Sequence, residues 1–179
     1  MTPKIHAALI ALAAALAVGC ASVETPQEKE ALVKAADTSR QAWISTDPSI
    51  DGLIKKGYGY VLFPDAGSGG FIVAGSHGHG VVYEQGQQVG FAELTGGSIG
   101  LTVGGQKYSE LIVFENKAAM DRFKKSEMGF GANANAVIAK TGAGTAASFA
   151  DGVAVLVRPL AGAMAEASVG GQKIKYVPK

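Results

Sequence analysis

Two histidines are the clearest candidate metal ligands in the sequence. His77 and His79 lie in the glycine-flanked stretch 75–80. Because alternate residues of a β-strand point to the same face, a strand here would let both imidazoles share one metal ion. The remaining histidine is His6, and no cysteine lies nearby to complete a ligand set. The sequence therefore favours a solvent-facing turn between two strands over a metal site, and it predicts no cofactor.

Serines among glycines are the remaining candidates for catalysis. Ser68 and Ser98 lie in glycine-rich stretches without the strand–elbow–helix context of a hydrolase nucleophile. The stretch 67–70 also lacks the Gly-Lys-Ser/Thr ending of a phosphate-binding loop. Paired carboxylates do not cluster along the chain. The sequence therefore predicts that this protein is not an enzyme.

Basic side chains form two local clusters. Lys55 and Lys56 end one predicted helix, and Arg122, Lys124 and Lys125 crowd the end of another. Cations at helix C-termini interact favourably with the helix dipole, which explains both clusters without a ligand. The alternative is a patch for anionic lipid headgroups, worth about 1 kcal/mol per cation near such a surface.

The overall charge balance argues against nucleic acid as a partner. The chain has 16 Lys and Arg against 15 Asp and Glu. Lys4 precedes residue 20, so the segment 20–179 balances at 15 against 15. Without a strong basic excess, any anionic partner has to be met by a local patch.

The N-terminus predicts a secreted, lipid-anchored protein. Lys4 precedes an apolar run over residues 7–18, which at about 12 residues suits a signal peptide and is too short to span a bilayer. The segment 16–20, Leu-Ala-Val-Gly-Cys, resembles the lipobox of bacterial lipoproteins. Cys20 is the single cysteine, so an intramolecular disulfide is excluded. We expect a signal peptide over 1–19, acyl chains such as palmitate on Cys20, and a tether over 20–25.

The residues after the cysteine predict the location. Ala21 and Ser22 follow Cys20, and no Asp stands where it commonly retains lipoproteins at the inner membrane. We therefore expect an anchor in the outer membrane, on its periplasmic face, rather than in the inner membrane.

Three helices are predicted from capping signals and periodicity. Thr25, Pro26 and Glu28 form a capping box that starts a helix ending near residue 45. Asp47-Pro48 starts a second helix ending near Lys56. Asn116 caps a third over 117–126.

The rest of the chain alternates short apolar runs with glycine, of which there are 25 in all. Strands are predicted at 58–63 (stopped by Pro64-Asp65), 71–74, 81–84, 89–93, 98–103, 107–114, 130–139, 152–157, 164–169 and 174–177. Glycine at this density suggests bends and bulges. We expect one α+β domain over 26–179: a glycine-rich, strongly curved, mostly antiparallel sheet with an N-terminal helix pair and one inserted helix.

Several glycine motifs resemble those of a known family. These are Gly-Tyr-Gly-Tyr-Val-Leu-Phe-Pro at 57–64, Leu-Thr-Gly-Gly-Ser-Ile-Gly-Leu-Thr-Val-Gly-Gly-Gln at 94–106, Glu-Leu-Ile-Val-Phe at 110–114 and Phe-Gly-Ala-Asn-Ala at 130–134. In this order they are similar to the blocks of the SYLF domain family, over about residues 26–177. The resemblance implies non-enzymatic binding of membrane lipid, chiefly anionic phospholipid, with actin binding in some eukaryotic members.

These observations predict a lipid-anchored envelope protein whose SYLF-like domain binds anionic phospholipid. The cations named above are its candidate binding residues, and a glycine-rich face of the sheet is the alternative binding surface. Gly96, Gly97 and Gly100 are expected to be structural, at places where a Cβ would clash. The alternative is a structural lipoprotein that holds a protein partner in the periplasm through an exposed sheet edge.

Overall fold

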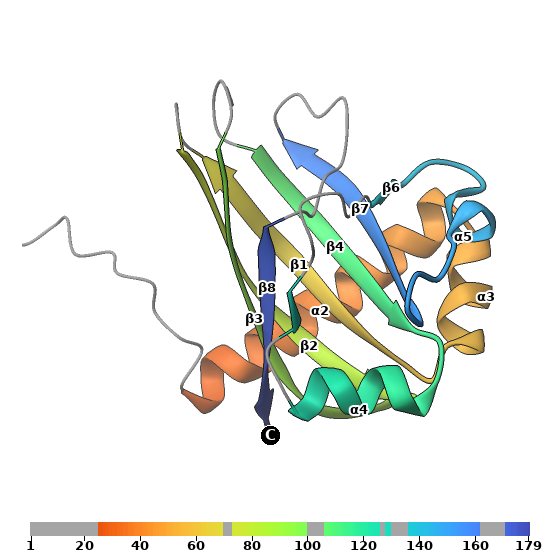
Figure 1. The fold of residues 1–179 in the computed structure, drawn as a ribbon, viewed down its shortest axis with the longest axis horizontal. Helices are drawn as coiled ribbons and strands as arrows, with labels where there is room; N and C mark the ends of the chain where they lie inside the picture. Colours follow the sequence, from red (N-terminus) through yellow and green to blue (C-terminus); the bar gives the residue numbers. More distant parts are fainter. Residues whose placement is uncertain (1–24, 70–72, 100–105, 126–127, 130–135, 162–170) are drawn as a thin grey trace, which may run out of the picture.

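A computed structural model describes residues 25–69, 73–99, 106–125, 128–129, 136–161 and 171–179 (Figure 1). Within these residues there are four helices: α2 (Pro26–Thr46), α3 (Ser49–Lys56), α4 (Lys117–Lys125) and α5 (Ala143–Ala146). None of the described helices is both long and apolar enough to cross a bilayer.

The helices begin where the local signals predict. Thr25 and Glu28 form both bonds of the capping box at the start of α2. The Asp47 carboxylate accepts from the Ser49 amide at the start of α3, and the Asn116 side chain accepts from the Ala119 amide at the start of α4. Side-chain caps of this kind satisfy amides that have no partner inside the helix.

The strands form one eight-stranded sheet in the order β5-β8-β3-β2-β1-β4-β7-β6. Neighbours are antiparallel, apart from the parallel pair β6–β7. The strands are β1 (Gly59–Gly69), β2 (Val73–Glu84), β3 (Gln87–Ile99), β4 (Gln106–Phe114), β5 (Met128–Gly129), β6 (Val137–Ile138), β7 (Val153–Ala161) and β8 (Gln172–Pro178).

A single hydrogen bond shows how strongly the sheet curls. The Gln172 side-chain amide on β8 donates to the Tyr108 hydroxyl on β4 at 3.0 Å. Strands β3, β2 and β1 lie between these two strands. Four strand spacings would put the two residues about 19 Å apart in a flat sheet. The sheet therefore bends into a half-barrel whose inner side chains meet across the interior, visible as the curved ribbon of Figure 1.

Each face of the sheet has its own apolar core. The inner core includes Phe63, Leu94 and Phe114 and is closed at one end by Met120 and Phe123 of α4. The outer core packs the sheet against α2, α3 and α5 and includes the buried residues Trp43, Ile50, Leu62, Leu111 and Leu156. The predicted α+β class, with a curved and mostly antiparallel sheet, an N-terminal helix pair and one inserted helix, is confirmed.

Strand ends were predicted less well than helix ends. Pro64 was expected to stop a strand, but β1 continues through it with a bulge between Phe63 and Ala66. The Ser109 hydroxyl donates to the Phe63 carbonyl at 2.8 Å inside this irregular stretch. A proline is tolerated in a central strand where a bulge already interrupts the ladder.

Glycine also broke fewer strands than predicted. The stretch 75–80 continues β2 instead of forming a turn, so the runs at 71–74 and 81–84 belong to one strand in the described part. Likewise β3 spans 87–99, and the turn before it contracts to Gln85-Gly86, both with positive φ. Helix α5 was not predicted, and the strand expected at 164–169 lies outside the described residues.

Candidate functional site

A cleft of about 690 Å³ opens where α3 ends and β1 begins. Helix α2 provides one side, the C-terminus of α3 another, and the β2–β3 turn a third. Its lining combines cations, carboxylates and aromatic rings: Asp37, Arg40, Ile54, Lys55, Lys56, Gly57, Tyr58, Gly59, Tyr60, Tyr83, Gln85, Gly86 and Glu115.

Two tyrosines form the aromatic floor of the cleft. Tyr60 on β1 and Tyr83 on β2 are cross-strand partners, and their rings stack with centroids 4.7 Å apart and planes 13° apart. The Tyr83 hydroxyl donates to Asp37 at 3.4 Å. Burial raises the pKa of both phenols, and the Asp37 charge adds to the effect on Tyr83. Both rings therefore stay neutral, and at 6% and 9% exposure they form a largely buried floor beneath the cleft.

Two glycines of the cleft lining let the backbone between α3 and β1 pack closely against its neighbours. A Cβ on Gly57 would lie 2.5 Å from Val113 Cγ1, and one on Gly59 would lie 2.7 Å from the Tyr83 carbonyl oxygen. Side chains at these positions would push α3 and β1 away from their neighbours. In the alternation Gly-Tyr-Gly-Tyr at 57–60, the glycines let the backbone pack closely, while Tyr58 packs against the inner core and Tyr60 against the outer one.

The predicted cations Lys55 and Lys56 both line this cleft. Lys55 is largely exposed and pairs with Asp51 at 2.6 Å, one helical turn earlier. Lys56 makes no ion pair within the described part of the chain. Arg40 joins them from α2, so three cations face two carboxylates, Asp37 and Glu115, around the tyrosine floor.

The predicted cations of α4 lie at the same end of the sheet but not in the cleft lining (Figure 1). Lys124 donates to Glu84 at 2.7 Å and lies 6.0 Å from the centre of the Tyr176 ring. The bond to Glu84 raises the pKa of Lys124. Arg122 donates to the Asp151 carbonyl at 2.5 Å. These two cations therefore fasten α4 to the sheet and to the loop before β7.

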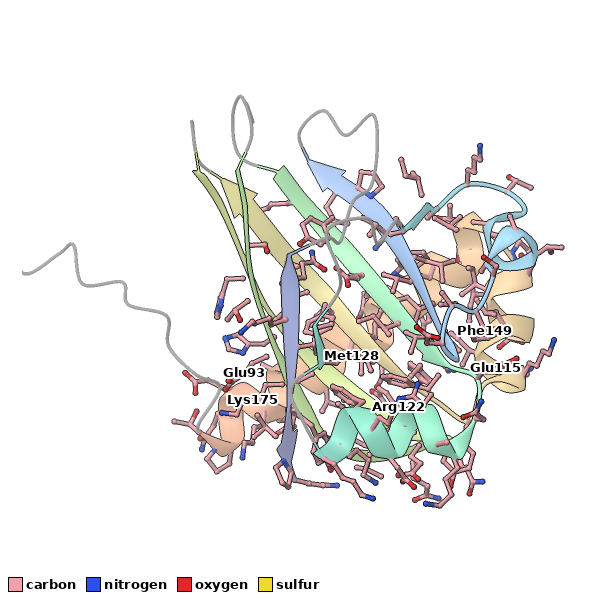
Figure 2. All side chains as sticks on the ribbon, viewed as in Figure 1. Glu93, Glu115, Arg122, Met128, Phe149 and Lys175 are labelled. Carbon is pink, nitrogen blue, oxygen red and sulfur yellow. The ribbon has the colours of Figure 1, made fainter. Side chains whose placement is uncertain are left out.

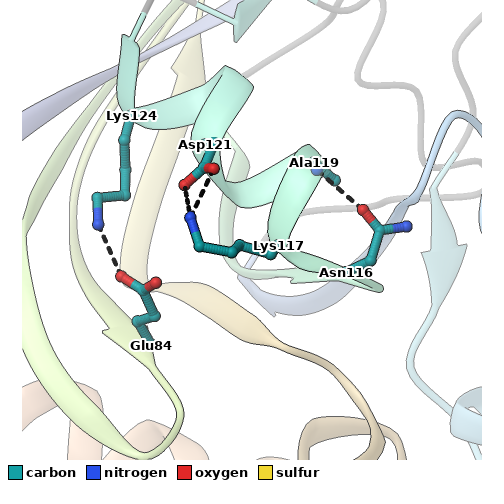
Figure 3. A network of polar contacts seen from close by, with 6 residues as sticks. All are labelled: Glu84, Asn116, Lys117, Ala119, Asp121 and Lys124. Atoms are coloured by element: carbon teal, nitrogen blue, oxygen red, sulfur yellow. Dashed lines mark hydrogen bonds and ion pairs between the residues drawn. The ribbon is translucent and has the colours of Figure 1, made fainter.

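Figure 3 shows how the charges of α4 are organised. Lys117 binds both oxygens of Asp121, at 3.0 and 2.7 Å, one turn further along the helix. Lys124 reaches across to Glu84 at the end of β2. Lys125, like Lys56, makes no ion pair with a described residue. Among the described residues, Lys56 and Lys125 are thus the two predicted cations that make neither an ion pair nor a side-chain hydrogen bond.

The two histidines project from a regular strand. His77 and His79 lie on the same face of β2, with Nε2 atoms 3.2 Å apart. No group of three His, Cys, Asp or Glu side chains in the described residues is arranged to hold a metal ion.

The predicted structural residues are placed only in part. A Cβ on Gly96 would lie 2.5 Å from Ser76 Oγ and 3.1 Å from Gln172 Cα, on the crowded inner face. Gly97 pairs with Gly75 in the β2–β3 ladder. Gly100 and Cys20 lie outside the described residues, as do the predicted signal peptide and nearly all of the tether.

Sequence reasoning missed the tyrosines, Arg40 and two buried carboxyls. The alternation of Tyr58 and Tyr60 was visible, but Tyr83 joins them only through the β1–β2 register. Asp47 accepts a bond from the Gly144 amide, 97 positions along the chain. Glu110 is fully buried, and its oxygens have no hydrogen-bond partner in the part of the chain that the structure describes. Neither burial could be read from the local sequence.

Comparison with known proteins adds two findings. Residues 95–176 match the family described as "Ysc84: Las17-binding protein actin regulator". The chain is also 26% identical over 140 residues to "Beta cell expansion factor A" of Aeromonas veronii, an alignment that covers 77% of this chain. It covers 53% of that relative, so the chain spans about half the length of the curated protein it matches.

Proposed function

Because the chain carries a domain of the Ysc84 (SYLF) family, as its motifs predicted, we propose that it binds anionic phospholipid without catalysing a reaction. We further propose that the cleft between α2, α3 and the β2–β3 turn takes the headgroup. The observation that supports this most is the convergence of Arg40, Lys55 and Lys56 on a stacked tyrosine pair.

The chemistry of the cleft suits an interfacial lipid. Each cation near an anionic membrane contributes about 1 kcal/mol of attraction, which falls off within a Debye length. Tyrosine is favoured at membrane interfaces, where its ring is apolar and its hydroxyl stays hydrated. Lysine ammonium groups and the Arg40 guanidinium can donate to phosphate oxygens, while the largely buried Tyr60 and Tyr83 rings form the floor beneath them.

The cations of α4 have a secondary role in this proposal. Lys124 and Arg122 are held by Glu84 and by the Asp151 carbonyl. Lys125, at the end of α4, can approach the same membrane surface once the cleft has bound a headgroup. Acyl chains on Cys20 would keep the domain at the periplasmic face of the outer membrane, so that headgroup binding orients a domain that is already anchored.

A flotation experiment tests the headgroup proposal. Full-length chain carrying Cys20→Ser, which removes the acylation site, should float with phosphatidylglycerol vesicles at low salt and much less with phosphatidylcholine vesicles. Lys56→Glu should reduce flotation roughly five-fold or more, because the change reverses a charge in the cleft. Salt at about 0.5 M, where the Debye length is roughly 4–5 Å, should reduce it as well.

Lys140→Glu is the matched control, since Lys140 is exposed and does not line the cleft. Equal losses from Lys56→Glu and Lys140→Glu would show that only net charge matters and would contradict a headgroup cleft. Binding that ignores both charge and salt would contradict the electrostatic basis of the proposal.

A protein partner is the second candidate. The matching family is described as "Las17-binding protein actin regulator". On the sheet, β8 is flanked on its outer side by the two-residue strand β5, which leaves most of that edge open to strand pairing in the part of the chain that the structure describes. Among the described residues β5 pairs with β8 only at Ile174 and Lys173. Failure to float with either vesicle would favour this candidate.

A further inference from the structure

Strand β2 carries a pair of imidazoles that the proposed lipid site does not use. His77 and His79 point to the outer side of the sheet, away from the inner core, since their neighbours Gly78 and Gly80 face inward against Ala66 and Phe63. Both histidines are half-buried. Their rings meet edge to face, with centroids 4.8 Å apart and planes 87° apart.

The spacing of the two nitrogens matches that of two ligands on one metal ion. Imidazole nitrogens bind zinc at about 2.0–2.1 Å. Two such bonds at angles from 90° to 109° place the nitrogens about 2.8–3.4 Å apart. His77 Nε2 and His79 Nε2 are 3.2 Å apart, inside that interval. The strand therefore presents both nitrogens at chelating distance before any metal arrives.

The surroundings also favour a cation. Glu93 on β3 is the cross-strand partner of His79, and Thr95 is the partner of His77. The Glu93 carboxylate lies 3.9 Å from Lys175 on β8, so it is only loosely paired (Figure 2). On the other side of β2, His77 faces Gly67, which has no side chain to fill the space beside the ring.

We propose that His77 and His79 form a surface binding site for a divalent late-transition metal ion, with copper(II) bound most tightly. Imidazole ligands suit Cu, Zn, Ni and Fe, and affinity for a given nitrogen site rises along the series to Cu²⁺. Two protein ligands leave the remaining positions to water. The site is therefore an exchangeable one and differs from a structural zinc centre, which needs four protein ligands.

Metal binding rearranges one proton without changing the charge of either ring. A hydrogen bond between two Nε2 atoms requires an N–H on one of them. On binding, that ring adopts its other neutral tautomer, with the proton on Nδ1, and both Nε2 lone pairs bind the metal. Acid weakens binding because a proton then competes for the same nitrogens.

Metal titration of the full-length chain tests this site. All samples carry Cys20→Ser, so that no thiol competes for the ion. The parent should bind one equivalent of Cu²⁺ by calorimetry in a non-coordinating buffer, and Ni²⁺ and Zn²⁺ more weakly. His77→Gln and His79→Gln should each weaken Cu²⁺ binding by about tenfold or more, whereas His6→Gln should not change it. The electron paramagnetic resonance spectrum of the bound copper should show coupling to two imidazole nitrogens.

Folding is checked separately, because β2 is a central strand. Thermal unfolding without metal shows whether each variant is folded, and Cu²⁺ should raise the Tm of the parent by linkage. If a variant fails to fold, the copper spectrum of the parent decides. A spectrum with one coupled nitrogen, no binding by the parent, or equal affinity in the parent and both folded variants would overturn the proposal.

Discussion

Adjacent residues of β4 meet opposite surroundings on the two faces of the sheet. Ser109 points to the outer face and Glu110 to the inner one, and neither is exposed to solvent. Ser109 donates to the Phe63 carbonyl, so its oxygen accepts from Trp43 Nε1 and from the Ser39 hydroxyl, each at 2.9 Å. Among the described residues, neither carboxyl oxygen of Glu110 has a hydrogen-bond partner.

The two buried carboxyls repeat this contrast. Burial by itself raises the pKa of Asp47, but bonds from the Gly144 amide and from the hydroxyl and amide of Ser49 outweigh it and lower the pKa to about 2. Burial raises the pKa of Glu110 to about 8, with the nearby Gln172 side chain acting in the opposite direction. The outer face thus stabilises a charge with donors, whereas the inner face keeps an acid neutral.

The largest expected effect is a loss of stability at alkaline pH caused by Glu110 on the inner face. The folded chain keeps the Glu110 proton up to about pH 8, whereas the unfolded chain releases it near the ordinary value of 4.5. Between these values the folded state binds more protons, so the free energy of unfolding falls as pH rises. The loss should reach about 4 kcal/mol by pH 8–9 relative to pH 4, of which roughly 2–3 kcal/mol falls between pH 6 and pH 9. Glu110→Gln should remove it, which urea unfolding at pH 6 and pH 9 would measure.

Glu115→Gln is the control for this change, because Glu115 is an exposed acid one residue beyond the same strand. That variant should keep the full pH dependence of the parent. If Glu110→Gln and the parent lose stability in parallel between pH 6 and pH 9, the inner carboxyl is ionised and hydrated, and the contrast between the faces fails.

Acid pH should expose the opposite behaviour at Asp47. Its lowered pKa means that the folded state favours the charged form, a stabilisation present above pH 4 and lost as the pH falls towards 2. Asp47→Asn should therefore cost about 2–3 kcal/mol at pH 7 and much less at pH 2.5. Asp51→Asn, which breaks only an exposed pair with Lys55, should cost under about 1 kcal/mol. Equal costs in guanidinium unfolding would contradict the assignment.

The contrast also shows what the sequence could predict. The start of a helix depends on residues within one turn of it. Thr25 and Glu28 are enough to predict the start of α2, and Asn116 is enough to predict the start of α4. The curved α+β fold followed from glycine among β-branched residues and from the family motifs. Strand continuity is not local, because the bulge at Pro64 and the glycine run at 75–80 are held by neighbouring strands.

In the candidate site, too, the residues that depend on local sequence were predicted and those that depend on tertiary structure were not. Lys55 and Lys56 were predicted because a charge pair is visible in a single helix. Tyr83 lies 23 positions after Tyr60, and only the β1–β2 register stacks their rings. The burial of Glu110 depends on the curl that brings β8 towards β4 across the interior. Such pairings arise from tertiary structure, so the sequence alone could not place them.

The smallest expected effect comes from removing the Ser109 hydroxyl, which makes three hydrogen bonds on the outer face of the sheet. Ser109→Ala leaves the Trp43 N–H and the Phe63 carbonyl, which lies next to the Pro64 bulge, without their side-chain partner. Each buried group without a partner costs about 1 kcal/mol or more, so the variant should lose about 2 kcal/mol at every pH from 5 to 9. Ser39→Ala removes only one of the three bonds and should cost about 1 kcal/mol. A double-mutant cycle would then give a coupling near the value of that one bond, because the two serines share a single contact. If Ser109→Ala proved neutral, water or a backbone shift would be replacing the hydroxyl, and the outer face would be no better satisfied than the inner one.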